Sequence, residues 1–115
     1  MYFFREDVKL ISSHIKKVYI PMTETGFYIL LCLREMMHGY EVAQKIKNLT
    51  QGDVNIGPGT LYGSLSKMEK DGLIHMEKKE NMRKYYKITD LGEEVLQIEI
   101  RRINRLFSNM KEALS

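Results

Sequence analysis

The densest group of chemically active side chains lies in residues 78–87. This segment holds five basic residues and one acidic residue, a net charge of +4 in a chain whose total is +3. Clustered positive charge binds polyanions, because contact with phosphates releases condensed counterions. A charged edge strand protected from aggregation is the alternative. The basic residues that we expect to contact phosphates are Lys78, Lys79, Arg83 and Lys84.

A second group of polar side chains lies on one face of the segment 58–72. Apolar residues recur there at helical spacing and predict a buried side: Leu61, Leu65 and Met68. The opposite face carries hydroxyls, an amine and an aromatic ring, which contact base edges and phosphates in a major groove. A solvated helix face is the alternative. Residues predicted to contact DNA on this segment are Thr60, Tyr62, Gly63, Ser64 and Lys67.

The sequence contains no convincing catalytic or metal-binding set. His14, His38 and His75 lie on different predicted elements, and no His-x-x-x-His or Cys-x-x-Cys spacing occurs. Cys32 is the single cysteine and lies in an apolar run, so we interpret it as a core residue in a reducing cytosol. A redox sensor is the alternative. We therefore expect no enzymatic activity, no metal and no cofactor.

Apolar periodicity and cap residues predict the elements that would position these groups. Pro21, Gly39 and Gly52 are expected to end successive helices, Thr23 and Thr89 to begin others. The predicted elements are helices over 6–18, 24–37, 40–49 and 58–70, strands over 73–79 and 83–88 joined by a turn at 80–82, and a final helix from 90.

Three helices followed by a hairpin are typical of a winged helix-turn-helix, a mainly α fold with an α+β wing. Here a helix precedes that unit and a long helix follows it. The predicted organisation is an N-terminal helix packing on the last helix (1–21), a winged helix-turn-helix that binds double-stranded DNA (22–89) and a C-terminal dimerisation helix (90–115).

The final helix carries an apolar seam with heptad spacing. So much apolar surface must pack against the N-terminal helix, against a second subunit, or against both. We expect a homodimer that presents two recognition helices to successive major grooves. An effector contact at Phe107 and Met110 is a weaker hypothesis, with a dry dimer core as its alternative. The seam comprises Leu96, Ile100, Ile103, Phe107, Met110 and Leu114.

Four stretches in order resemble the PadR family of transcriptional regulators: 38–42 (HGYEV), 59–62 (GTLY), 65–74 (LSKMEKDGLI) and 83–92 (RKYYKITDLG). The single C-terminal helix resembles the short subfamily. The resemblance implies a homodimeric, usually repressing regulator of the bacterial cytoplasm, in many relatives released from DNA by a small aromatic or hydrophobic effector. It also implies that Tyr40, Thr60 and Tyr62 lie at or near the DNA. Arg83 and Lys84 are implied to belong to the wing.

The chain departs from that pattern in two ways. Position 63 is glycine where proline or a bulkier residue is common, and tryptophan is absent, which puts a pocket for planar drugs in doubt. A winged helix used only for protein interaction is the competing function, and the basic wing opposes it. The longest apolar run, residues 27–33, is too short to span a bilayer, so we expect a cytoplasmic protein with no membrane partner.

Overall fold

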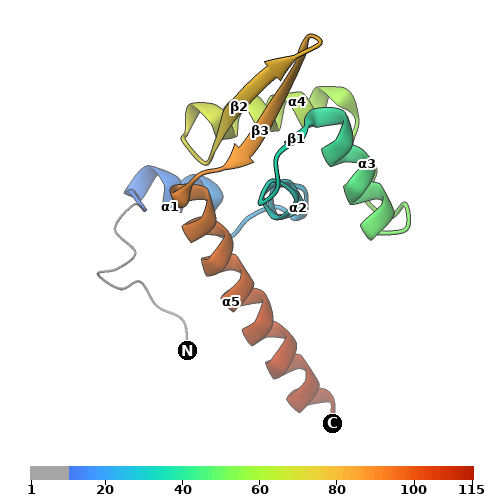
Figure 1. Ribbon diagram of the computed structural model, residues 1–115. Helices are drawn as coiled ribbons and strands as arrows, with labels where there is room; N and C mark the ends of the chain where they lie inside the picture. Colours follow the sequence, from blue (N-terminus) through green and yellow to red (C-terminus); the bar gives the residue numbers. More distant parts are fainter. Residues whose placement is uncertain (1–10) are drawn as a thin grey trace.

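The computed structural model describes residues 11–115 and has five helices and a three-stranded sheet in that range (Figure 1). The predicted fold class, a winged helix-turn-helix with added terminal helices, is confirmed. The elements are α1 (Ser13–Tyr19), α2 (Glu24–Cys32), β1 (Met37–His38), α3 (Gly39–Leu49), α4 (Pro58–Lys70), β2 (Ile74–Glu80), β3 (Arg83–Ile88) and α5 (Asp90–Leu114).

Local sequence signals fix three of the helix starts as expected. The Thr23 hydroxyl accepts the Gly26 N–H at 3.0 Å at the start of α2. The Thr89 hydroxyl accepts the Gly92 N–H at 3.1 Å at the start of α5. Pro58 is the first residue of α4, where its missing N–H would have no intrahelical partner.

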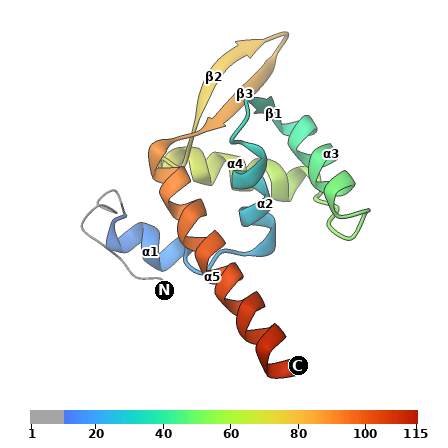
Figure 2. The same cartoon turned by 60° about the horizontal axis from the view of Figure 1, so that its bottom comes forward.

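The N-terminal helix is shorter than predicted within the described residues. Its first residue is Ser13, because the Ser12 hydroxyl accepts the Ile15 N–H and Ser12 itself has extended backbone angles. The part of the prediction over 6–10 lies outside the described residues. As expected, the helix ends before Pro21. Both views place α1 beside the N-terminal part of α5 (Figures 1 and 2).

The prediction that α2 continues to about Met37 is wrong, and so is the prediction that Gly39 ends it. The helix ends at Cys32, and the Leu33 carbonyl accepts the Ile88 N–H at 2.7 Å. Met37 then pairs with Tyr86, which makes β1 the third strand of the sheet. The backbone N–H and C=O groups that follow α2 form hydrogen bonds with β3 and its end. The local sequence of α2 does not reveal this distant partner.

The hairpin of β2 and β3 is closed by a tighter turn than expected. Glu80 pairs with Arg83, so the turn consists of Asn81 and Met82 alone. Both have positive φ, 52° and 62°, as in the two-residue turns that suit the twist of a hairpin. The sheet order is β1-β3-β2 and all pairs are antiparallel.

The core is formed by the buried sides of all five helices and the sheet, with only the first half of α5 taking part. Cys32 is buried in it, and burial raises the pKa of its thiol, which supports the interpretation as a core residue. Glu99 of α5 is also fully buried; it accepts the Met22 N–H and two hydrogen bonds from Arg102, at 2.9 and 3.1 Å. Among residues 11–115, no helix has the length and apolarity needed to cross a bilayer.

Candidate nucleic-acid interface

Helix α4 separates its apolar and polar residues as the sequence predicts. Leu61, Leu65 and Met68 are buried against the core. The opposite side carries exposed Thr60, Tyr62, Gly63 and Lys67 and a half-buried Ser64. The first turn of α4 contains no acidic residue and Gly57 makes no side-chain cap, so its N–H groups suit an anion.

A groove of about 410 Å³ lies between α4, the start of α3 and the wing, which is the hairpin of β2 and β3. It brings together four of the predicted DNA contacts, Tyr40, Tyr62, Arg83 and Lys84, although they come from three different elements. The remaining predicted contacts are exposed or half-exposed on α4 and the wing and do not line the groove: Thr60, Gly63, Ser64, Lys67, Lys78 and Lys79.

Gly39 allows α3 to begin against the ring of Tyr62. A Cβ at this position would lie 2.7 Å from Tyr62 Cε1, closer than a side chain tolerates. Gly63 differs, because nothing lies within 4 Å of its would-be Cβ. Gly63 therefore has no close neighbour among residues 11–115, and its predicted contact with DNA stays a prediction.

The basic residues of the wing differ in their local partners. The Lys78 ammonium lies 3.3 Å from the Glu80 carboxylate and 4.8 Å from the centre of the Tyr85 ring. Lys79 and Lys84 instead stand directly opposite each other across the hairpin. Like charges in that position disfavour the hairpin, and a phosphate between them would offset the repulsion. Lys79 and Lys84 are therefore better placed than Lys78 to meet an anion.

The sequence profile described as "Transcriptional regulator PadR-like family" matches residues 29–98, which include the whole groove. The chain belongs to the PadR-like family. Regulators of this family bind DNA and are not enzymes, which confirms the expectation that this PadR-like chain has no enzymatic activity. The matched range also contains every predicted contact of α4 and the wing.

Individual relatives agree with this assignment. The PadR-like chain is 34% identical over 64 residues to "Transcriptional regulator YqjI" of Escherichia coli (strain K12), covering 56% of this chain and 31% of that protein. It is 36% identical over 70 residues to "Uncharacterized protein X" of Lysinibacillus sphaericus, covering 57% of this chain and 64% of that protein. The chain thus spans less than two thirds of the length of these relatives.

Solved structures show the same architecture. A transcriptional regulator from Clostridium thermocellum is 26% identical, with a TM-score of 0.68 over 91% of this chain and 99% of that one. A PadR family regulator from Clostridium difficile R20291 is 24% identical, with a TM-score of 0.69 over 81% of this chain and 100% of that one. The second likeness supports the fold alone.

Five residues that line the groove in the PadR-like chain are not in the set of DNA contacts predicted from the sequence: His38, Gly39, Ser66, Met82 and Tyr86. Met82 is 92% exposed at the tip of the wing. His38 is buried and caps α3, with Glu41 completing a capping box. The three-residue spacing from His38 to Glu41 is the signal that could have shown this, with histidine in place of the usual serine or threonine.

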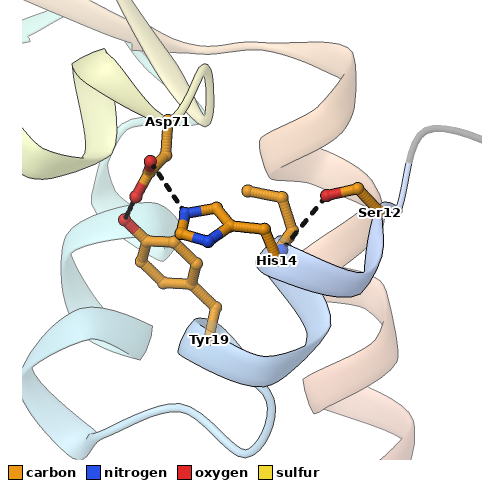
Figure 3. A network of polar contacts seen from close by, with 5 residues as sticks. Ser12, His14, Tyr19 and Asp71 are labelled. Carbon is orange, nitrogen blue, oxygen red and sulfur yellow. Dashed lines mark hydrogen bonds and ion pairs between the residues drawn. The ribbon is translucent and has the colours of Figure 1, made fainter.

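A polar cluster ties α1 to the end of α4 (Figure 3). The Tyr19 hydroxyl donates to the Asp71 carboxylate at 2.6 Å, and His14 Nε2 lies 3.2 Å from the other carboxylate oxygen. The hydroxyl of Tyr19 holds the pKa of Asp71 below its ordinary value, with His14 adding to the effect. Because Asp71 is the C-cap of α4, α1 contributes to the placement of the predicted DNA-reading helix.

Replacing Tyr19 with phenylalanine is expected to lower the free energy of unfolding by about 1 kcal/mol at pH 7. Asp71 has a lowered pKa in the folded state, so its contribution is present above the ordinary aspartate pKa. It is lost as the pH falls through the lowered value. Urea unfolding at pH 7 and at a series of lower pH values should show the difference between wild type and variant shrinking as the pH falls below the ordinary aspartate pKa. Tyr28→Phe is the matched control, and a constant difference at every pH would contradict the prediction.

The predicted dimerisation seam divides into two parts on α5. Leu96 is fully buried inside its own domain and Ile100 packs against that core. The C-terminal half of α5 extends away from the other elements (Figures 1 and 2). It leaves a row of large apolar side chains exposed by 39–79%: Ile103, Leu106, Phe107, Met110 and Leu114. Leu106 was not among the predicted seam residues.

Proposed function

We propose that this PadR-like chain binds double-stranded DNA in a sequence-specific way and represses transcription as a homodimer on a two-fold-related operator. The observation that carries the proposal is the groove in which Tyr40 and Tyr62 lie beside Arg83 and Lys84 of the wing. It combines aromatic and hydroxyl groups, which can contact bases, with cations that neutralise phosphates. Repression and a cytoplasmic location are proposed from the family resemblance.

The homodimer is proposed from the exposed apolar row on α5. Full burial of one side chain of this size contributes about 1.5–3 kcal/mol of stabilisation. A row of five such side chains therefore favours association of two chains. A two-fold dimer through α5 would carry two copies of α4 related by one axis, which would explain an operator with two related half-sites. The N-terminal helix packing on α5, within the chain or across the dimer, belongs to this proposal.

Fluorescence anisotropy with promoter duplexes at two salt concentrations tests DNA binding. We expect affinity to fall steeply with salt. Tyr62→Ala should lower affinity for the preferred duplex about tenfold while changing binding to unrelated duplexes little. Lys84→Ala should weaken both alike and reduce the salt slope by about one. Salt-independent binding, or no binding to any duplex including the region upstream of the gene itself, would contradict the proposal.

A small-molecule effector beside Phe107 and Met110 is a refinement of the same proposal. Both side chains are about half exposed on α5, and the Lys111 ammonium lies 5.2 Å from the centre of the Phe107 ring. Aromatic, thioether and cationic groups together suit a small aromatic ligand that lies in the dimer interface. A thermal-shift screen with phenolic acids and cationic dyes tests this refinement, and a screen without a stabilising compound counts against it.

A further inference from the structure

His38 lies where the helix-turn-helix meets the wing. It is the last residue of β1, paired with Tyr85 of β3, and it is also the N-cap of α3. Its side chain is buried, whereas Arg83, at the start of β3, is exposed beside it. One ring therefore contacts both the element that carries Tyr40 and the element that carries the predicted wing contacts.

The two ring nitrogens of His38 face two different donors. Nδ1 lies 3.4 Å from the backbone nitrogen of Glu41, and Nε2 lies 3.4 Å from the Arg83 guanidinium. A neutral imidazole has a single acceptor nitrogen, so the ring accepts from one of them at a time. When it accepts from Arg83, α3 keeps the other half of its capping box, because the His38 N–H still donates to the Glu41 carboxylate at 3.1 Å.

Two aromatic rings and a carboxylate lie around the His38 ring. The Tyr40 ring stacks on His38 at 6.5 Å with an interplanar angle of 18°, and the Tyr85 ring meets it edge-on at 5.2 Å. The Glu41 carboxylate also lies 3.3 Å from Nε2. It attracts the Arg83 guanidinium to this side of the ring, and it competes with Arg83 for Nε2, because an Nε2–H would donate to it. A guanidinium has five N–H donors, so one bond to His38 leaves the others for a phosphate or a base edge.

We propose that His38 is a positioning residue for DNA binding, whose Nε2 accepts from Arg83 and holds that guanidinium at the groove. The inference rests on the proposed function, since it needs Arg83 to contact DNA. An arginine side chain loses rotamer freedom when it binds, and orienting it beforehand reduces that loss. His38 thus acts through Arg83 and does not itself need to touch the nucleic acid.

Asparagine and glutamine at position 38 separate the two roles of the ring. The shorter His38→Asn replaces the Nδ1 acceptor, so it should keep the cap of α3 and its melting temperature. It should lower DNA affinity about five- to tenfold and reduce the salt slope by about one, as Arg83→Ala does. The longer His38→Gln places its amide oxygen near the position of Nε2, so it should retain more affinity than His38→Asn does. Both are compared with wild type by anisotropy on one duplex and by thermal melting.

A double-mutant cycle decides whether His38 acts through Arg83. In the Arg83→Ala background, His38→Asn should change affinity by no more than about twofold. An equal loss in both backgrounds, or wild-type affinity for His38→Asn alone, overturns the inference. Wild-type affinity for Arg83→Ala also overturns it, while the salt-dependent binding of the unmodified protein would leave the proposed function standing. The proposed function fails instead if the unmodified protein binds no duplex.

Discussion

Replacing Phe107 with glutamate is expected to make the protein monomeric and to lower its affinity for a two-fold operator by about a hundredfold or more. Phe107 lies near the middle of the exposed row on α5 and is 55% exposed in the single chain. A carboxylate there would lose its hydration in any dimer that covers this row, and pairing with Lys111 one turn away would offset only part of that cost. A dimer binds both half-sites at once, so its affinity for the operator is much higher than that of a monomer for a single half-site.

Ser108→Glu provides the matched control, because it adds the same charge to the neighbouring residue, which the helical period turns away from the row. Light scattering coupled to size exclusion should report a dimer for wild type and Ser108→Glu and a monomer for Phe107→Glu. Circular dichroism should show that the winged domain of each variant is folded. A Phe107→Glu protein that remains dimeric would contradict the assignment of this row to the interface.

The elements that could be predicted from the sequence are those whose signals are local. Helix α4 is an example, since Pro58 begins it and the spacing of its leucines fixes the buried side. The threonine caps at positions 23 and 89 are also read from short sequence patterns. In each case the residues that decide the structure lie within one or two turns of the element, so no knowledge of distant partners is needed.

The features that were missed depend on partners distant in the sequence. Strand β1 has two residues and exists because Met37 pairs with Tyr86. Glycine is typical of helix ends, yet Gly39 is the first residue of α3, because His38 caps the helix and the Tyr62 ring occupies the space of a Cβ at position 39. His38 could not be placed in the groove for the same reason. The sequence therefore predicts the polar face of α4 and the basic wing as two separate surfaces. Tertiary contacts are what bring them together in one groove.

The division of α5 into a buried and an exposed half follows the same reasoning. Its heptad spacing predicts an apolar stripe, but spacing does not say which part of the stripe the chain itself covers. Leu96 packs into its own core, and the fully buried Glu99 binds the Met22 N–H just before α2. Ile103 still lines a pocket with Phe27 of α2, and beyond it the stripe has left the domain. The proposed partner surface therefore begins about where the intrachain contacts end.

Replacing Gly92 with alanine is expected to lower the free energy of unfolding by about 3 kcal/mol or more. A Cβ at this position would lie 2.1 Å from the carbonyl oxygen of Leu73 and 2.7 Å from Ile88 Cγ1. The first neighbour is backbone and cannot rotate away, and its carbonyl also accepts the Thr89 N–H at 3.0 Å. Relief of the clash would therefore move α5 away from the turn that follows α4 and disrupt the Thr89 bonds to this turn.

Gly63→Ala is the control, because nothing lies within 4 Å of a Cβ in the middle of α4. Alanine should stabilise that position by up to about 1 kcal/mol, so the two substitutions should have opposite signs. Thermal melting should show Gly92→Ala about 10 °C or more below wild type and Gly63→Ala at or above it. Equal melting temperatures would mean that α5 adjusts without cost. The start of α5 would then not be fixed by contact with Leu73, and α5 would be free to change its angle to the winged domain.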